Sequence, residues 1–185
     1  MAIEDKQVGD LRFAATFNEG EELVHVNGSL ERDTLRAFDF SGSLSPGRDQ
    51  ELDLVLRMDR LDLRFLNPYL PDDISDIQGK VTGEVAVKGR LASPEFNGFA
   101  DLENAGLRIN YLNTFYSFSH RVNILPDMFT LDQVRLHDDE GHWGVANGTI
   151  IHHGLQDWNF DVSMEMAGLK VLDTDAQNNE LYYGK

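Results

Sequence analysis

Hydrophobic and polar residues alternate with a period of two along most of the chain, which places successive side chains on opposite faces of a β-strand. The segment from Gly79 to Leu91 is the clearest case, because its odd positions are Gly, Val or Leu and its even positions are Lys, Thr, Glu, Ala or Arg. The same alternation predicts strands over 11–17, 52–58, 96–102, 116–124, 131–136, 143–151 and 158–166. We expect about a dozen strands, joined by turns such as Ser45-Pro46-Gly47, Ser93-Pro94 and Asp138-Asp139-Glu140-Gly141.

One segment departs from this pattern. Leu63, Leu66 and Leu70 have helical spacing, and Pro68 and Pro71 limit the length of any helix there. The chain is therefore predicted to be all-β, an antiparallel sheet with at most one short helix, and to form a single β-rich segment over 1–185.

Six glycines lie between apolar neighbours in the pattern apolar-x-Gly-x-apolar: Gly28, Gly42, Gly83, Gly89, Gly98 and Gly148. Three of them follow Asn, and Asn-Gly commonly forms a hairpin turn. The alternation keeps its phase through these glycines, so we expect them inside strands and on the apolar face. Two roles remain open: the glycines bend or bulge a coiled sheet, or they let another backbone or a ligand approach closely.

Composition narrows the classes of partner. The 185 residues carry a formal net charge of −16, which disfavours nucleic acid and anionic membrane surfaces. A hydrophobic content of 41% is enough for a folded core, and no window is apolar enough to span a bilayer. Without cysteine there is no disulfide, thiolate nucleophile or Cys-based zinc site. The first residues lack the layout of a secretion signal, so an exported parent protein would carry its signal upstream.

Signals for catalysis are scarce, and the sequence predicts no enzyme, no cofactor and no metal. The segment His137-Asp138-Asp139-Glu140-Gly141-His142 holds possible metal ligands, but acidic residues and Gly between two strands also favour a hairpin loop. Likewise, His152 and His153 near Asp157 form either a strand-end turn or a base with an orienting carboxylate. No nucleophile motif accompanies them.

The ordered pattern of Gly and apolar residues resembles a known family. It starts at Ile77-Gln78-Gly79-Lys80-Val81-Thr82-Gly83-Glu84-Val85-Ala86-Val87-Lys88-Gly89 and continues through Leu91, Pro94, Phe96, Gly98 and Leu102. It is similar to the repeated strand unit of the AsmA and TamB superfamily. Later segments resemble the TamB branch in its Bacteroidota version: Ile109-Asn110-Tyr111-Leu112-Asn113-Thr114, Asp138-Asp139, Gly148-Thr149-Ile150-Ile151-His152, Asp157-Trp158-Asn159-Phe160-Asp161 and Tyr182-Tyr183-Gly184-Lys185. The resemblance is best over 61–185.

This resemblance implies an elongated curled sheet, taco-like in section, within a longer periplasmic protein anchored in the inner membrane. It implies phospholipid transport between the two membranes, and assembly of outer-membrane proteins with an Omp85-class barrel that binds elsewhere on the parent protein. The concave apolar groove would contact phospholipid acyl chains. The residues expected to line it are Val81, Val85, Val87, Leu91, Phe96, Leu102, Ile109, Phe118, Val122 and Ile124.

Two other functions stay open. A sealed sandwich or barrel has the same alternation, so the chain is alternatively a structural or adhesive spacer of an envelope protein. A glycan-cleaving enzyme would need two carboxylates facing each other across a cleft. Free sheet edges would also allow edge-to-edge self-association of the fragment.

Overall fold

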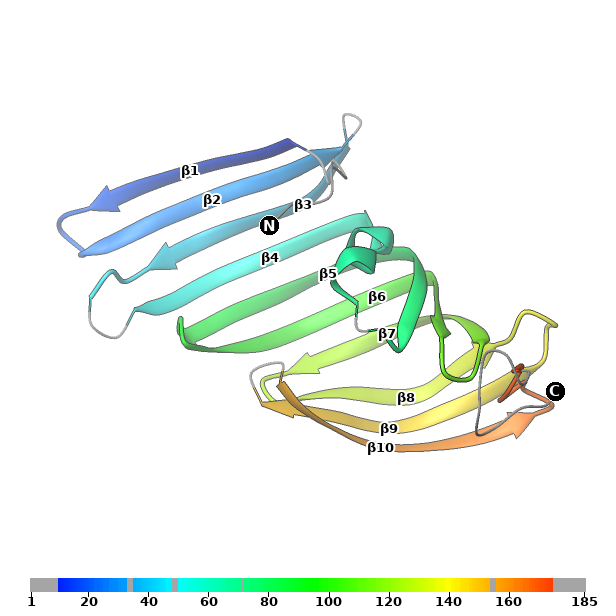
Figure 1. Ribbon diagram of the computed structural model, residues 1–185. Helices are drawn as coiled ribbons and strands as arrows, with labels where there is room; N and C mark the ends of the chain where they lie inside the picture. Colours follow the sequence, from blue (N-terminus) through cyan, green and yellow to red (C-terminus); the bar gives the residue numbers. More distant parts are fainter. Residues whose placement is uncertain (1–9, 33–34, 48–49, 71, 154–155, 175–185) are drawn as a thin grey trace.

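The computed structural model describes residues 10–32, 35–47, 50–70, 72–153 and 156–174. Ten strands form one antiparallel sheet in which every strand pairs with the next one in the chain. The sheet is open and curled, with β1 and β10 at its two edges (Figure 1). The strands are β1 (Asp10–Asn18), β2 (Leu23–Arg32), β3 (Leu35–Leu44), β4 (Glu51–Asp62), β5 (Ile74–Arg90), β6 (Ser93–Ile109), β7 (Thr114–Leu125), β8 (Met128–His137), β9 (Trp143–His153) and β10 (Gln156–Ala167).

The predicted all-β class is confirmed, and the short helix is the 3-10 helix η1 (Leu63–Tyr69) between β4 and β5. The side chain of Asp62 caps η1 by accepting a hydrogen bond from the backbone N–H of Arg64. The described residues form ten strands, where the sequence predicted about a dozen for the whole chain, and β5 and β6 are each 17 residues long. One detail of the prediction is wrong. Ser93 and Pro94 begin β6, and the turn before it lies at 91–92.

The strand register separates an apolar face from a polar face. One row of directly paired residues crosses all ten strands and contains only apolar residues and glycine: Phe13, Gly28, Phe40, Leu56, Val85, Gly98, Ile124, Phe129, Ile150 and Phe160. The adjacent row, on the other face, is Arg12, Ser29, Asp39, Arg57, Glu84, Phe99, Asn123, Thr130, Thr149 and Asp161. Nine spacings of about 4.8 Å give the apolar row a contour of roughly 43 Å.

Bulges keep the apolar residues on one face where the apolar positions change between even and odd residue numbers. Arg60, Asp76, Asn104, Gln133 and Asp157 have positive φ between +48° and +54°, and each lies at a break in strand register. In β6, for example, the apolar positions are even up to 102 and odd from 105 onward. An extra residue in one strand shifts the side-chain alternation by one, so each bulge restores the face that the sequence would otherwise lose.

Side chains on neighbouring strands hold several of these bulges. The backbone N–H of Asn104 donates to Ser119 Oγ at 2.8 Å, and that of Gln133 donates to Asn147 Oδ1 at 2.8 Å. Each of these side chains thus accepts a hydrogen bond from a backbone N–H that the bulge has removed from the regular strand pairing.

Two segments cover the apolar face at one end of the strands. Leu63 of helix η1 packs against Leu61, Val81 and Ala105, and these four residues form the buried core cluster. After β10, residues 168–174, here called the strap, return across the ends of β9, β8 and β7. The ribbon shows η1 in front of β5 and β6, and the chain after β10 at the same end of the sheet (Figure 1).

Candidate functional site: the apolar face

Nine of the ten residues predicted to line a groove lie on the apolar face of strands β5, β6 and β7. Direct pairs join Val87 with Phe96, and Val81 with Leu102. Ile109, which sequence parity alone would place on the opposite face from Leu102, shares this face because of the bulge at Asn104. Leu91 is the exception: it lies in the turn after β5, and its side chain is 52% exposed.

Burial divides the apolar face into a covered end and an uncovered end. Beneath η1 and the strap, the buried residues include Leu61, Val81, Ala105, Tyr116 and Ala146. Toward the other ends of the strands, buried positions are fewer. The curled centre of the sheet still hides Val85 and Val87, which are 7% and 6% exposed, because their strand neighbours crowd around them.

The remaining apolar positions toward that end are half-buried or exposed. Half-buried members include Leu54, Phe96, Ile124, Phe129 and Ile150. A half-buried side chain on a sheet face has apolar surface still in contact with water, and covering that surface is favourable by about 25 cal/mol per Å². This end of the face is therefore the part of the molecule best suited to receive another apolar group.

Both edge strands expose large apolar side chains on the same face. Phe13 and Phe17 on β1 are 62% and 54% exposed, and Phe160 and Met166 on β10 are 67% and 54% exposed. In the described strands, no position on this face is occupied by Asp or Glu. The face thus offers apolar contact up to both edge strands.

All six predicted glycines lie within strands on this face, including the three that follow Asn. At Gly42 a Cβ would lie 2.0 Å from the carbonyl oxygen of Asp53, and at Gly148 it would lie 2.0 Å from that of Asp161. Their φ values of +151° and +149° suit glycine far better than any L-residue. Of the two roles left open by the sequence, close approach of a neighbouring backbone is the one that the geometry displays at these positions.

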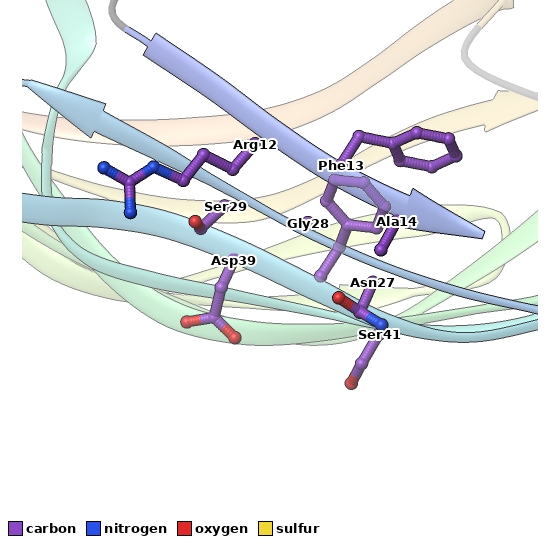
Figure 2. A pocket seen from close by; sticks show the side chains of 9 residues that line it. Arg12, Phe13, Ala14, Asn27, Gly28, Ser29, Asp39 and Ser41 are labelled. Atoms are coloured by element: carbon purple, nitrogen blue, oxygen red, sulfur yellow. The ribbon is translucent and has the colours of Figure 1, made fainter. Parts of the chain in front are cut away.

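An aromatic cluster stands on the apolar face near the β1 edge. The rings of Phe13 and Phe40 stack with centroids 6.2 Å apart, and Phe38 lies 6.2 Å from Phe40. Gly28, between Phe13 and Phe40 in the row, leaves the space that the Phe40 ring fills. Figure 2 shows Phe13 above Gly28, with the side chains of Arg12 and Asp39 pointing away from the Phe13 ring. These residues line a cavity of about 350 Å³.

Ion pairs between neighbouring strands occupy the polar face. Arg57 contacts Glu84 at 2.9 Å, Lys88 contacts Asp53 at 3.2 Å, and Arg121 contacts Asp101 at 2.6 Å. These pairs are exposed, so each contributes little to stability. Their main consequence is that this face stays hydrated and resists association.

The segment 138–141 forms the predicted hairpin turn, and Asp138 connects this turn to the strap. The buried Asp138 carboxylate accepts hydrogen bonds from the backbone N–H groups of Glu140, His142 and Lys170 at 3.0, 2.8 and 2.8 Å. Burial alone would raise the pKa of Asp138, but these donors outweigh it and lower the pKa to about 2. Among the described residues, no group of three or more His, Asp or Glu is arranged to hold a metal ion.

The Lys170 side chain completes this connection. Its ammonium group lies 2.9 Å from Asp139, 2.9 Å from Glu140 and 3.1 Å from Asp173. Hydrogen bonding to Glu140 and Asp139 raises the pKa of Lys170. The sequence did not predict the strap, because its seven residues are too few to show a strand or helix pattern. The nearest signal was the acidic run Asp138-Asp139-Glu140, which pairs with Lys170 in the structure.

The strap is further tied to the sheet by backbone and side-chain hydrogen bonds. Tyr116 donates its hydroxyl to the Lys170 carbonyl at 2.7 Å, and the Asp173 N–H donates to the Leu112 carbonyl at 2.9 Å. Leu169 is 6% exposed and packs over Gly144, whose missing side chain leaves the space. The strap therefore closes one end of the apolar face.

His152 belongs to the last residues of β9. Its ring is completely buried, 5.0 Å from the Phe129 ring, and its backbone N–H donates to Asp127. Asp157 lies exposed in the β10 bulge. The side chain of His153 is outside the described part. The surroundings of His152 are those of a packed strand-end residue.

Comparison with known proteins adds no relative. The chain matches no protein-family model, no curated protein and no solved structure. In the part of the chain that the structure describes, no helix has the length and apolarity to cross a membrane.

Proposed function

We propose that this chain is a segment of a periplasm-spanning, TamB/AsmA-like envelope protein whose apolar face carries phospholipid acyl chains between the inner and outer membranes. The supporting observation is the row of apolar residues and glycine across all ten strands, together with the partial exposure of that face away from η1 and the strap. The parent protein is anchored in the inner membrane and assists outer-membrane protein assembly with an Omp85-class barrel, through a region outside this chain.

Physical chemistry accounts for the suitability of such a face. Each methylene that leaves a bilayer for water costs about 0.8 kcal/mol. Contact with Phe96, Ile124 and Phe129 replaces the apolar environment of the bilayer with another apolar environment. The free-energy change of moving an acyl chain along the sheet is therefore close to zero. The contour of roughly 43 Å exceeds the hydrocarbon thickness of about 30 Å of a whole bilayer. A phospholipid then needs no deep pocket, and its head group remains in water.

Site-specific photo-crosslinking tests this proposal. A photoreactive amino acid replaces either Phe96 or Asn97, which are adjacent in β6 but on opposite faces, and the purified protein is incubated with phospholipid vesicles. We expect a lipid adduct from position 96 and none from position 97. Equal labelling at both positions, or none at position 96 in a folded protein, contradicts the proposal.

The second candidate is a structural spacer with a sealed interior. The burial of Val85 and Val87 and the cover provided by η1 and the strap favour it. In that case the folded protein excludes phospholipid, and position 96 gives no adduct. The variant Val85→Asp of the parent protein further distinguishes lipid carriage from a spacer role. An unpaired charge in an apolar setting costs several kcal/mol and would stop lipid passage. A spacer that still folds would function normally.

A further inference from the structure

A cavity of about 530 Å³ opens on the polar face where β6, β7 and β8 meet. Its polar lining consists of Arg135 and His137 from β8, Ser117 and Ser119 from β7, and Asn104 and Gln78 from the neighbouring strands. All six side chains can donate hydrogen bonds, and none is a carboxylate. This composition is unusual in a chain with a net charge of −16.

The cavity lies beside an irregular stretch of the pairing between β7 and β8. Strands β7 and β8 pair at Ser117 with His137 and next at Asn123 with Thr130, and the register breaks between these pairs. The Gln133 bulge lies within this interval of β8. Phe118, whose strand position belongs to the apolar face, also lines the cavity.

Arg135 is held in place without a carboxylate partner. Its guanidinium lies 4.8 Å from the centroid of the Trp143 ring, and it forms no ion pair with any described residue. By contrast, Arg57, Arg108 and Arg121 on the same face are each paired with an acidic side chain. Stacking on an aromatic ring orients a guanidinium while leaving its N–H groups available.

The donors around Arg135 are likewise available. Ser119 Oγ accepts a hydrogen bond from the Asn104 backbone N–H, and its own O–H remains to donate. The three other cavities described for this protein each include a carboxylate: Asp39 in the first, Glu140 in the second and Glu103 in the third. The cavity at Arg135 is thus the one among these four whose chemistry suits an anion.

We propose that the cavity at Arg135 and His137 binds a phosphate group. A guanidinium can donate two parallel N–H groups to phosphate oxygens, and the hydroxyl and amide donors opposite it supply the remaining hydrogen bonds. The group is either free inorganic phosphate or the phosphodiester of a phospholipid head group. The cavity lies on the polar face, opposite the face proposed to carry acyl chains, so neither source depends on the proposed lipid-carrying function.

An amide chemical-shift titration of the 185-residue chain by NMR tests this site. The probes are inorganic phosphate and, separately, dihexanoyl phosphatidylglycerol below its micelle concentration, with chloride at matched ionic strength as the reference. We expect saturable shifts at Ser117, Ser119 and His137. Arg135→Gln should raise Kd by about tenfold or more, since a hydrogen bond to a charged group is lost. His137→Gln, a second variant that keeps side-chain polarity, should also weaken binding.

The control variant is Arg121→Gln, which changes the net charge by the same amount on the same face, but at an arginine already paired with Asp101. Its Kd should equal that of the unmodified chain. Saturation by inorganic phosphate supports a free-phosphate site, and saturation by the phospholipid alone supports a head-group site. The absence of saturation with both probes, or equal weakening by Arg121→Gln and Arg135→Gln, overturns the proposal. Lipid adducts at position 96, on the other face, do not depend on Arg135. Failure of the phosphate site can therefore be distinguished from failure of the proposed lipid carriage.

Discussion

At the scale of single residues, glycine on the apolar face allows close approach of a neighbouring backbone, which was one of two roles that the sequence left open. The pattern placed Gly42 and Gly148 inside strands, and the structure has them there. The pattern did not predict their positive φ. It also did not predict that a carbonyl oxygen of the neighbouring strand lies where a Cβ atom would be. These features depend on how strands pair, which a local pattern does not specify.

A substitution series at glycine tests this role. Gly148→Ala should lower the free energy of unfolding by about 1–3 kcal/mol, because the added Cβ meets the Asp161 carbonyl and the φ of +149° is unfavourable for alanine. Gly47→Ala is the matched control, since its Cβ would meet only a serine hydroxyl at 3.6 Å. Urea denaturation measures both. Equal midpoints for the two variants contradict the backbone role.

Asp138 gives a pH-dependent prediction. Its pKa is lowered from 3.8 to about 2, so its contribution to folding is present above pH 4 and is lost as the pH falls from about 4 to 2. Asp138→Asn has the shape of the protonated acid and lacks this contribution. The free energy of unfolding should therefore differ between the two proteins by about 2 kcal/mol at pH 7 and by almost nothing near pH 2. A difference that does not change with pH contradicts the assigned cause.

At the scale of elements, the strap is the feature that the sequence did not predict. Its contacts are long-range: Lys170 reaches the turn after β8, and Asp173 reaches the turn before β7. The strands themselves were predicted from alternation, but the bulges that join their in-phase parts were not. After Leu102 the apolar positions change from even to odd residue numbers. Such a change in the sequence does not distinguish a bulge from the end of a strand.

Leu169 tests the docking of the strap. Leu169→Ala removes a buried side chain that packs over Gly144 and should cost the docked strap about 2–4 kcal/mol. Hydrogen exchange at the amides of Lys170 and Asp173 should accelerate, whereas amides of β5 should be unaffected. Val171→Ala, at a 49% exposed position, is the control and should leave exchange unchanged. Unchanged protection of Lys170 and Asp173 in Leu169→Ala would show that the polar contacts alone hold the strap.

At the scale of the whole molecule, the register aligns ten short alternating patterns into one apolar face. Alternation predicts that each strand has an apolar side, and short antiparallel connections predict that neighbouring strands share it. How far this face is covered was not predictable, because η1 and the strap reach it from outside the pattern. Whether the uncovered end carries acyl chains is the central functional claim.

Native mass spectrometry of the protein after exposure to phospholipid vesicles tests that claim most directly. We expect the unmodified protein and the Asn97→Asp variant to retain bound phospholipid. The Phe96→Asp variant, with the same charge added on the apolar face of the same strand, should lose it while staying folded by circular dichroism. Lipid-free spectra for all three folded proteins, or equal retention by Phe96→Asp, would contradict lipid carriage by this face.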